Sequence, residues 1–222
     1  MKRDYPILIG ACGWDHSGWQ DTFYPADLPA DWRLGYYANE FPLVLIRAEA
    51  WQGEMAAADV WLESSDDSFR FVCEIPLEAT DDIPRWQARV SPLGDRLAGV
   101  LLQCGNENSE AMLAQWLDKW GGISAVCVDF GHRRVDSAIT DMLRQRGTGW
   151  CWHGETEADG LMIGTLAIAR IKSENCDPKV LRHLLETCLR AVDEHRQMVL
   201  LFEGTPPDVK VMRDAGMILD LL

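Results

Sequence analysis

Acidic and imidazole side chains stand directly after several apolar runs of this chain, and their types suit proton transfer. Asp129 and His132 follow the most apolar of these runs, while Glu74 and Glu203 each end another one. A carboxylate and an imidazole held within reach of one substrate can act as a general acid/base pair. The sequence therefore predicts Asp129 and His132 as this pair, with Glu74 or Glu203 as a second catalytic carboxylate.

A second set of side chains at the same strand ends could hold a substrate. Its guanidinium groups suit an anionic or polyhydroxylated molecule, and its indole rings could stack on a sugar. The predicted substrate-binding residues are Trp14, Trp19, Arg47, Glu49, Gln103, His153 and Arg170. A structural interpretation stays open, in which the tryptophans pack at the end of a barrel and the glutamates pair with Arg47 and Arg170.

The same rim holds residue types that ligate divalent metals, namely His132, His153, Glu74, Asp129 and Glu155. They belong to separate apolar runs and form no compact spacing motif, so the sequence assigns no metal ligand and leaves the cofactor open. The glycine-rich loops of Walker and dinucleotide-binding sites and the nucleophile-elbow pattern are also absent from the sequence.

The elements that must position these residues are short apolar runs rich in β-branched residues. Eight of them are predicted as strands, over residues 6–12, 43–48, 69–75, 99–104, 123–130, 149–153, 165–171 and 198–202. Their nearly continuous apolar character is typical of parallel strands that are buried on both faces. Polar residues that follow such strands meet at one edge of the sheet.

Helical patterns separate the predicted strands. The clearest spans residues 178–192, with Asp177 as a cap and Pro178 in the first turn, and a second spans 112–120 after Ser109. Weaker helices fit residues 31–40, 52–64, 83–93, 136–146 and 206–222. Alternating strands and helices predict an α/β fold, a TIM-type (β/α)8 barrel formed by one domain over residues 1–222. Residues 154–163 would make a poor helix, so the sixth unit is expected to be short or irregular.

Composition narrows the classes of partner and compartment. The 222 residues carry 21 basic and 35 acidic side chains, a formal charge of −14 that argues against nucleic acids and anionic membranes and leaves small molecules open. The chain has seven cysteines, an odd number, and no C-x-x-C motif. Most of them lie in apolar runs, which predicts reduced thiols and a reducing compartment. With no signal-peptide pattern and no apolar run of membrane-spanning length, we expect a cytoplasmic protein of open oligomeric state.

Glycine and aromatic motifs are concentrated in the N-terminal part of the chain. They are Ile9-Gly10-Ala11-Cys12-Gly13-Trp14, Trp19, Phe23-Tyr24-Pro25, Tyr36-Tyr37-Ala38 and Phe41. Together these motifs resemble the N-terminal signature of the YecE-like family, domain of unknown function 72. Fainter similarities follow at Phe69-Arg70-Phe71, Leu101-Leu102-Gln103, Val128-Asp129-Phe130-Gly131-His132 and Ala169-Arg170. The resemblance implies a TIM-type barrel of bacterial origin, in a family that offers no established activity to carry over.

The chain also departs from the family pattern at the rim. The family's strand-two acid, amide and hydroxyl are missing from the segment that contains Arg47 and Glu49. Glu74 stands where the family has a lysine, and Gly131 stands where it has an arginine. These changes imply a divergent, rather short member whose rim chemistry has been altered or lost.

Two functions remain open from the sequence. The first is a hydrolase or isomerase that acts on a small polar or sugar-like metabolite at the C-terminal rim of the barrel. The second is a non-catalytic binding or scaffold barrel whose rim has drifted. Asp129, His132 and a second carboxylate around one pocket would favour the enzyme, whereas Arg47 and Arg170 held in ion pairs would favour the scaffold.

Overall fold

The computed structural model describes residues 6–51, 58–77, 82–105, 109–120, 122–133, 135–155 and 157–222. Its eight strands are β1 Ile7–Cys12, β2 Leu43–Ile46, β3 Arg70–Pro76, β4 Leu97–Gln103, β5 Val126–Asp129, β6 Gly149–Trp150, β7 Leu166–Lys172 and β8 Gln197–Glu203. Each lies within or overlaps one of the eight predicted runs. The predicted strands over 123–130 and 149–153 are shorter in the structure.

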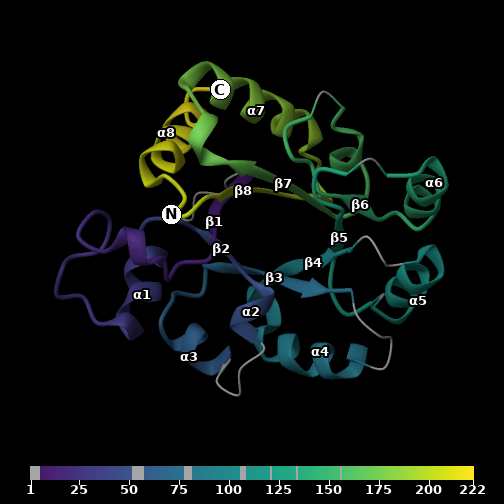
Figure 1. The fold of residues 1–222 in the computed structure, drawn as a ribbon, viewed down its shortest axis with the longest axis horizontal. Helices are drawn as coiled ribbons and strands as arrows, with labels where there is room; N and C mark the ends of the chain where they lie inside the picture. The colour runs from purple at the N-terminus through teal and green to yellow at the C-terminus, as the bar shows by residue number, and fades with distance from the viewer. Residues whose placement is uncertain are drawn as a thin grey trace.

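All strand pairs are parallel, in the order β6-β5-β4-β3-β2-β1-β8-β7. A parallel bridge between Trp152 and Ala169 joins the two ends of this sheet. The amide of Trp152 donates to the carbonyl of Ile168 at 3.0 Å, and the amide of Arg170 donates to the carbonyl of Trp152 at 2.8 Å. The strands thus form a ring with the helices outside it, as Figure 1 shows, and the predicted TIM-type barrel is confirmed.

The helices pack around the outside of this ring (Figure 1). They are α1 Arg33–Ala38, α2 Ala48–Trp51, α3 Ala58–Glu63, α4 Ile83–Val90, α5 Glu110–Trp120, α6 Ser137–Gln145, α7 Pro178–Ala191 and α8 Val209–Leu219. The predicted cap of α7 is confirmed, because the Asp177 carboxylate accepts from the amides of Lys179 and Val180. The predicted helix over 52–64 falls partly outside the described residues, and α3 forms its described end.

The sixth unit is irregular, as predicted. Between β6 and β7 the described residues form only a short 3-10 helix, η5 Asp159–Met162, in place of an α-helix. Gly160 explains its close packing, since a Cβ there would lie 2.4 Å from the carbonyl oxygen of Trp150. No helix in the described part of the chain is both long and apolar enough to cross a bilayer.

Two apolar cores hold the barrel together. The larger core lies between the strands and the helices, and the smaller core fills the ring itself. The smaller core consists of Cys12, Leu43, Leu45, Val72, Leu101, Cys127, Cys151, Leu166, Ile168, Val199 and Leu201. These residues are the inward-facing members of their strands, so they fix which later residues also point into the barrel.

Candidate functional site

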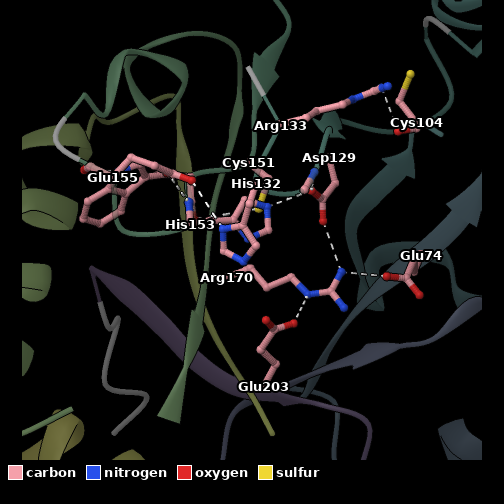
Figure 2. Close-up of polar contacts among 12 residues, drawn as sticks. Glu74, Cys104, Asp129, His132, Arg133, Cys151, His153, Glu155, Arg170 and Glu203 are labelled. Atoms are coloured by element: carbon pink, nitrogen blue, oxygen red, sulfur yellow. Dashed lines mark hydrogen bonds and ion pairs between the residues drawn. The ribbon is translucent and has the colours of Figure 1, made fainter. Parts of the chain in front are cut away.

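The polar residues above the inner core continue the inward-facing pattern of their strands. Side chains two positions apart on a strand lie on the same face. Two residues beyond inward-facing Val72, Cys127, Cys151, Ile168 and Leu201 stand Glu74, Asp129, His153, Arg170 and Glu203. These five side chains come from β3, β5, β7 and β8 and from the segment just after β6, and they meet at the carboxyl end of the barrel (Figure 2).

Arg170 lies at the centre of this group, between three carboxylates (Figure 2). Its Nη1 donates to Glu74 Oε1 at 2.8 Å and to Asp129 Oδ2 at 3.1 Å, and its Nε donates to Glu203 Oε2 at 2.8 Å. The Arg170 side chain is 12% exposed, and its pKa is raised because the three carboxylates and Cys12 outweigh the effect of burial. The guanidinium is therefore permanently charged.

Backbone amides hold two of these carboxylates in place. The amide of Ala48, the first residue of α2, donates to Glu74 Oε2 at 3.2 Å. The amide of Gly131 donates to Asp129 Oδ1 at 2.7 Å, from a turn in which Gly131 has a φ of +62°. Glycine adopts this left-handed conformation without strain, which explains a glycine two residues after the end of β5.

Asp129 and His153 form a buried hydrogen-bonded pair. His153 Nε2 lies 2.8 Å from Asp129 Oδ1, and their side chains are 5% and 3% exposed. Burial alone would raise the pKa of Asp129. The hydrogen bond and charge of His153, the Gly131 amide and the charge of Arg170 have a larger effect in the opposite direction, so the pKa of Asp129 is lowered. Asp129 is thus a carboxylate that fixes the orientation of the imidazole. The other ring nitrogen, His153 Nδ1, is buried and has no hydrogen-bond partner among the described residues.

Asp129 forms its hydrogen bond with His153 and not with His132, so the catalytic role of Asp129 together with His132 stays a prediction. His132 lies beyond the end of β5, with 60% of its side chain exposed. Its Nδ1 is 3.7 Å from Glu155 Oε1, and its ring centroid is 4.8 Å from that of His153. Glu155 also accepts from the backbone amide of His153 at 2.9 Å, so His132 and Glu155 flank the pair from the solvent side.

The pair lines a cavity of about 480 Å³ at the carboxyl end of the barrel. Its lining includes Gln103, Asp129, His132, His153, Arg170 and Glu203. Predicted site residues from the ends of five strands, β4 to β8, thus line one cavity. Cavities of several hundred Å³ accommodate small-molecule ligands. A neighbouring cavity of about 600 Å³, between the ends of β5 and β6 and helix α6, is lined by His132, Cys151 and Glu155 among others.

Four of the predicted substrate-binding residues, Trp14, Trp19, Arg47 and Glu49, lie outside this cavity's lining. Trp14 is half-buried and packs edge-on against Trp61, at a centroid distance of 5.8 Å. Arg47 is half-buried, and its Nε has no hydrogen-bond partner among the described residues. Glu49 is exposed on the short helix α2. The structure therefore does not bring these side chains to the Asp129–His153 pair.

Trp19 is a core residue, so the expectation that it stacks on a ligand is not met. It is 2% exposed and lies in η1 Ser17–Trp19. Its indole Nε1 donates to the carbonyl of Pro207 at 2.8 Å, and its ring stacks on Tyr37 at 6.1 Å. The ring and the N–H group of Trp19 are thus both used in contacts within the protein.

Cys151 lies beside the site, whereas the sequence pattern indicated only an apolar residue of a buried strand. Its Sγ lies with one oxygen of Asp129 and one ring nitrogen of His153 so that all three atoms are within 4.8 Å of one another. Burial raises the pKa of its thiol well above the usual value, so the metal-free residue is a neutral thiol. Its place two residues before His153 is the signal that could have predicted this, because both side chains point into the barrel.

A crystal structure from a family whose sequence profile matches this chain agrees with the fold. The sequence profile of the family described as "Protein of unknown function DUF72" matches residues 8–222. The crystal structure of a DUF72 family protein from Enterococcus faecalis V583 superposes with a TM-score of 0.65 at 14% identity, covering 97% of this chain and 96% of that one. A type I 3-dehydroquinate dehydratase from Clostridium difficile gives a TM-score of 0.44 at 7% identity, over 97% of this chain and 90% of that one.

No curated protein matches the chain in sequence. The family match covers nearly all of the chain, from the first strand of the barrel to the last helix. The chain therefore belongs to the DUF72 family, as the motifs around its first strand indicated.

Proposed function

We propose that this protein is an enzyme, a hydrolase or isomerase that acts on a small polar or sugar-like metabolite in the cavity at the carboxyl end of the barrel. The observation that supports it best is the Asp129–His153 pair, joined by a bond of 2.8 Å in the wall of that cavity. In this proposal His153 transfers the proton, and Asp129 is the positioning residue that fixes its tautomer.

The tautomer follows from the hydrogen bond. Because Asp129 is ionised and only accepts, neutral His153 carries its proton on Nε2. Nδ1 then bears a lone pair, the form in which an imidazole acts as a general base. Protonation at Nδ1 would create an imidazolium that the Asp129 carboxylate stabilises, so the same residue can return the proton as an acid.

Arg170 and Glu203 support a polar, hydroxyl-bearing substrate. Arg170 uses Nη1 and Nε for its three carboxylates, and its Nη2 carries no hydrogen bond to the described residues. Glu203 uses Oε2 for Arg170, is 18% exposed, and lines the cavity. A donor and an acceptor that lie side by side in this way suit adjacent hydroxyl groups or a carbonyl beside a hydroxyl.

The test is a turnover screen against a panel of phosphorylated and free sugars, sugar acids and hydroxy acids. The purified protein should turn over at least one compound, and His153→Gln should reduce that rate by about 10²–10⁴-fold, the usual contribution of a positioned acid/base group. His195→Gln is the matched control, because His195 is 82% exposed in the loop between α7 and β8. An unchanged rate in His153→Gln would contradict the assignment.

A second candidate function is a non-catalytic binding barrel. The three ion pairs of Arg170 favour it, because a guanidinium held by buried carboxylates can serve as a polar plug of the barrel. This alternative predicts that the panel contains ligands that bind without turnover. It also predicts that His153→Gln changes the dissociation constant and nothing else.

A further inference from the structure

We propose that Asp129, Cys151 and His153 form a binding site for one Zn²⁺ ion, which takes the place of the proton between Asp129 and His153. This metal site rests on the proposed function for its location, because Asp129 and His153 are the proposed proton-transfer pair. It goes beyond that function by naming an ion that would occupy the pair and block proton transfer.

The three ligand atoms are already close together. One carboxylate oxygen of Asp129, Cys151 Sγ and one ring nitrogen of His153 all lie within 4.8 Å of one another. Oxygen, sulfur and imidazole nitrogen are the ligands that Zn²⁺ takes in proteins, and three protein ligands leave a fourth position open. The site lies between two cavities, since Asp129 and His153 line one and Cys151 lines the other.

The charge around the site favours a cation. Glu74, Asp129 and Glu203 surround the single guanidinium of Arg170, so the buried group carries two more negative than positive charges while His153 is neutral. Excess buried charge is costly unless it is compensated. A divalent ion bound together with the Cys151 thiolate would add one net positive charge and so reduce this excess from two negative charges to one.

Two hydrogen-bond donors hold the Asp129 carboxylate in position, as partners behind the ligands of a metal site do. Arg170 Nη1 and the Gly131 amide bond the Asp129 carboxylate at 3.1 and 2.7 Å, and therefore orient it. The His153 side chain is 5% exposed, and its buried Nδ1 has no hydrogen-bond partner among the described residues. Its lone pair can therefore take the proton that leaves Nε2 when the ion binds.

Binding of Zn²⁺ displaces two protons, and one of them is released. Zn²⁺ bonds to an Asp129 oxygen, Cys151 Sγ and His153 Nε2, and the Nε2 proton moves to Nδ1. The Cys151 thiol loses its proton to solvent, so one proton is released for each ion bound and no oxidation occurs. The apparent affinity should therefore rise about tenfold for each pH unit while the thiol is protonated in the free protein.

The test is titration of the full chain with Zn²⁺ and with Co²⁺, after treatment with a chelator. We expect one equivalent of either ion to bind, and the Co²⁺ form to show a near-ultraviolet thiolate-to-cobalt charge-transfer band. Cys151→Ser should abolish the band, and Cys151→Ser and His153→Gln should each reduce the Zn²⁺ association constant by at least about 100-fold, the upper end of the loss seen for outer partners.

Cys176→Ser is the matched control, because Cys176 carries a half-buried thiol outside the barrel. This substitution should leave the charge-transfer band and the Zn²⁺ affinity unchanged. Circular dichroism of each variant shows whether it is folded, and Cys151→Ala provides a second variant without a ligand atom. Absence of stoichiometric binding, or equal binding by wild type and a folded Cys151 variant, would overturn the metal site. If Zn²⁺ binds but turnover is not inhibited, the proton-transfer proposal fails while the metal site stands.

Discussion

Arg170 organises the rim at the scale of single residues. Its contacts reach Glu74, Asp129 and Glu203, which lie on three different strands. Buried ion pairs of this kind contribute little net stability compared with apolar packing, but the loss of one partner leaves the other charges unpaired. The residue therefore has a large effect on stability when it is removed, whatever its role toward a substrate.

We predict that Arg170→Met lowers the free energy of unfolding by about 3–5 kcal/mol, since three carboxylates lose their counter-charge. Urea denaturation at neutral pH measures it. Arg182→Met is the control, because Arg182 pairs with Glu186 on the exposed face of α7 and should cost less than about 1 kcal/mol. Equal and small losses for both variants would show that the Arg170 cluster is not the closed ion group described above.

Asp129 makes stability depend on pH. Its pKa is lowered in the folded protein, so its contribution is complete above the unfolded value of about 3.9 and is lost as the pH falls through the folded value. The free-energy difference between wild type and Asp129→Asn should therefore be largest near pH 6 and shrink below about pH 4. Urea denaturation at both pH values measures this, and a difference that stays constant would contradict the lowered pKa.

Most of the rim residues could be predicted from the sequence, but the histidine that is bonded to Asp129 is His153 and not His132. Asp129 and His132 are close in the chain, and this favoured their pairing. The inward pattern of β5 ends with Asp129, whereas that of β6 runs through Cys151 to His153, which places His153 inside and His132 outside. Face alternation, rather than proximity in the chain, was the information that could have identified the pair.

At the scale of elements, the eight strands could be predicted because buried parallel strands are nearly continuous apolar runs. The short β6 was harder, since only Gly149–Trp150 pair as a strand and the chain then continues through a single bridge at Trp152. The role of the N-terminal loop could not be predicted either. Its tryptophan and tyrosine residues allow both ligand stacking and packing, and composition cannot separate the two.

Trp19 tests the packing interpretation of that loop. We predict that Trp19→Ala lowers the free energy of unfolding by about 3–5 kcal/mol, because it empties a buried aromatic site and removes the bond to Pro207. Trp32→Ala is the control, since Trp32 is 65% exposed and its removal should change stability by less than about 0.5 kcal/mol. A stable Trp19→Ala variant with impaired ligand binding would instead favour the stacking role.

At the scale of the whole molecule, the barrel makes a site from residues that are distant in the chain. Arg170 and Glu74 are 96 positions apart, and Asp129 and His153 are 24 apart. Closure of the ring at Trp152 and Ala169 brings His153 beside Arg170. The site therefore depends on the complete barrel, because no single segment of the chain contains it.

We expect Asp129 and His153 to act as one unit in proton transfer, and a double-mutant cycle measures whether they do. The rates of wild type, Asp129→Asn, His153→Gln and the double variant are compared on a substrate found by the screen. Because residues that act together are not additive, the double variant should be no slower than His153→Gln alone. Losses that multiply, or an unchanged rate in either single variant, would contradict the claim.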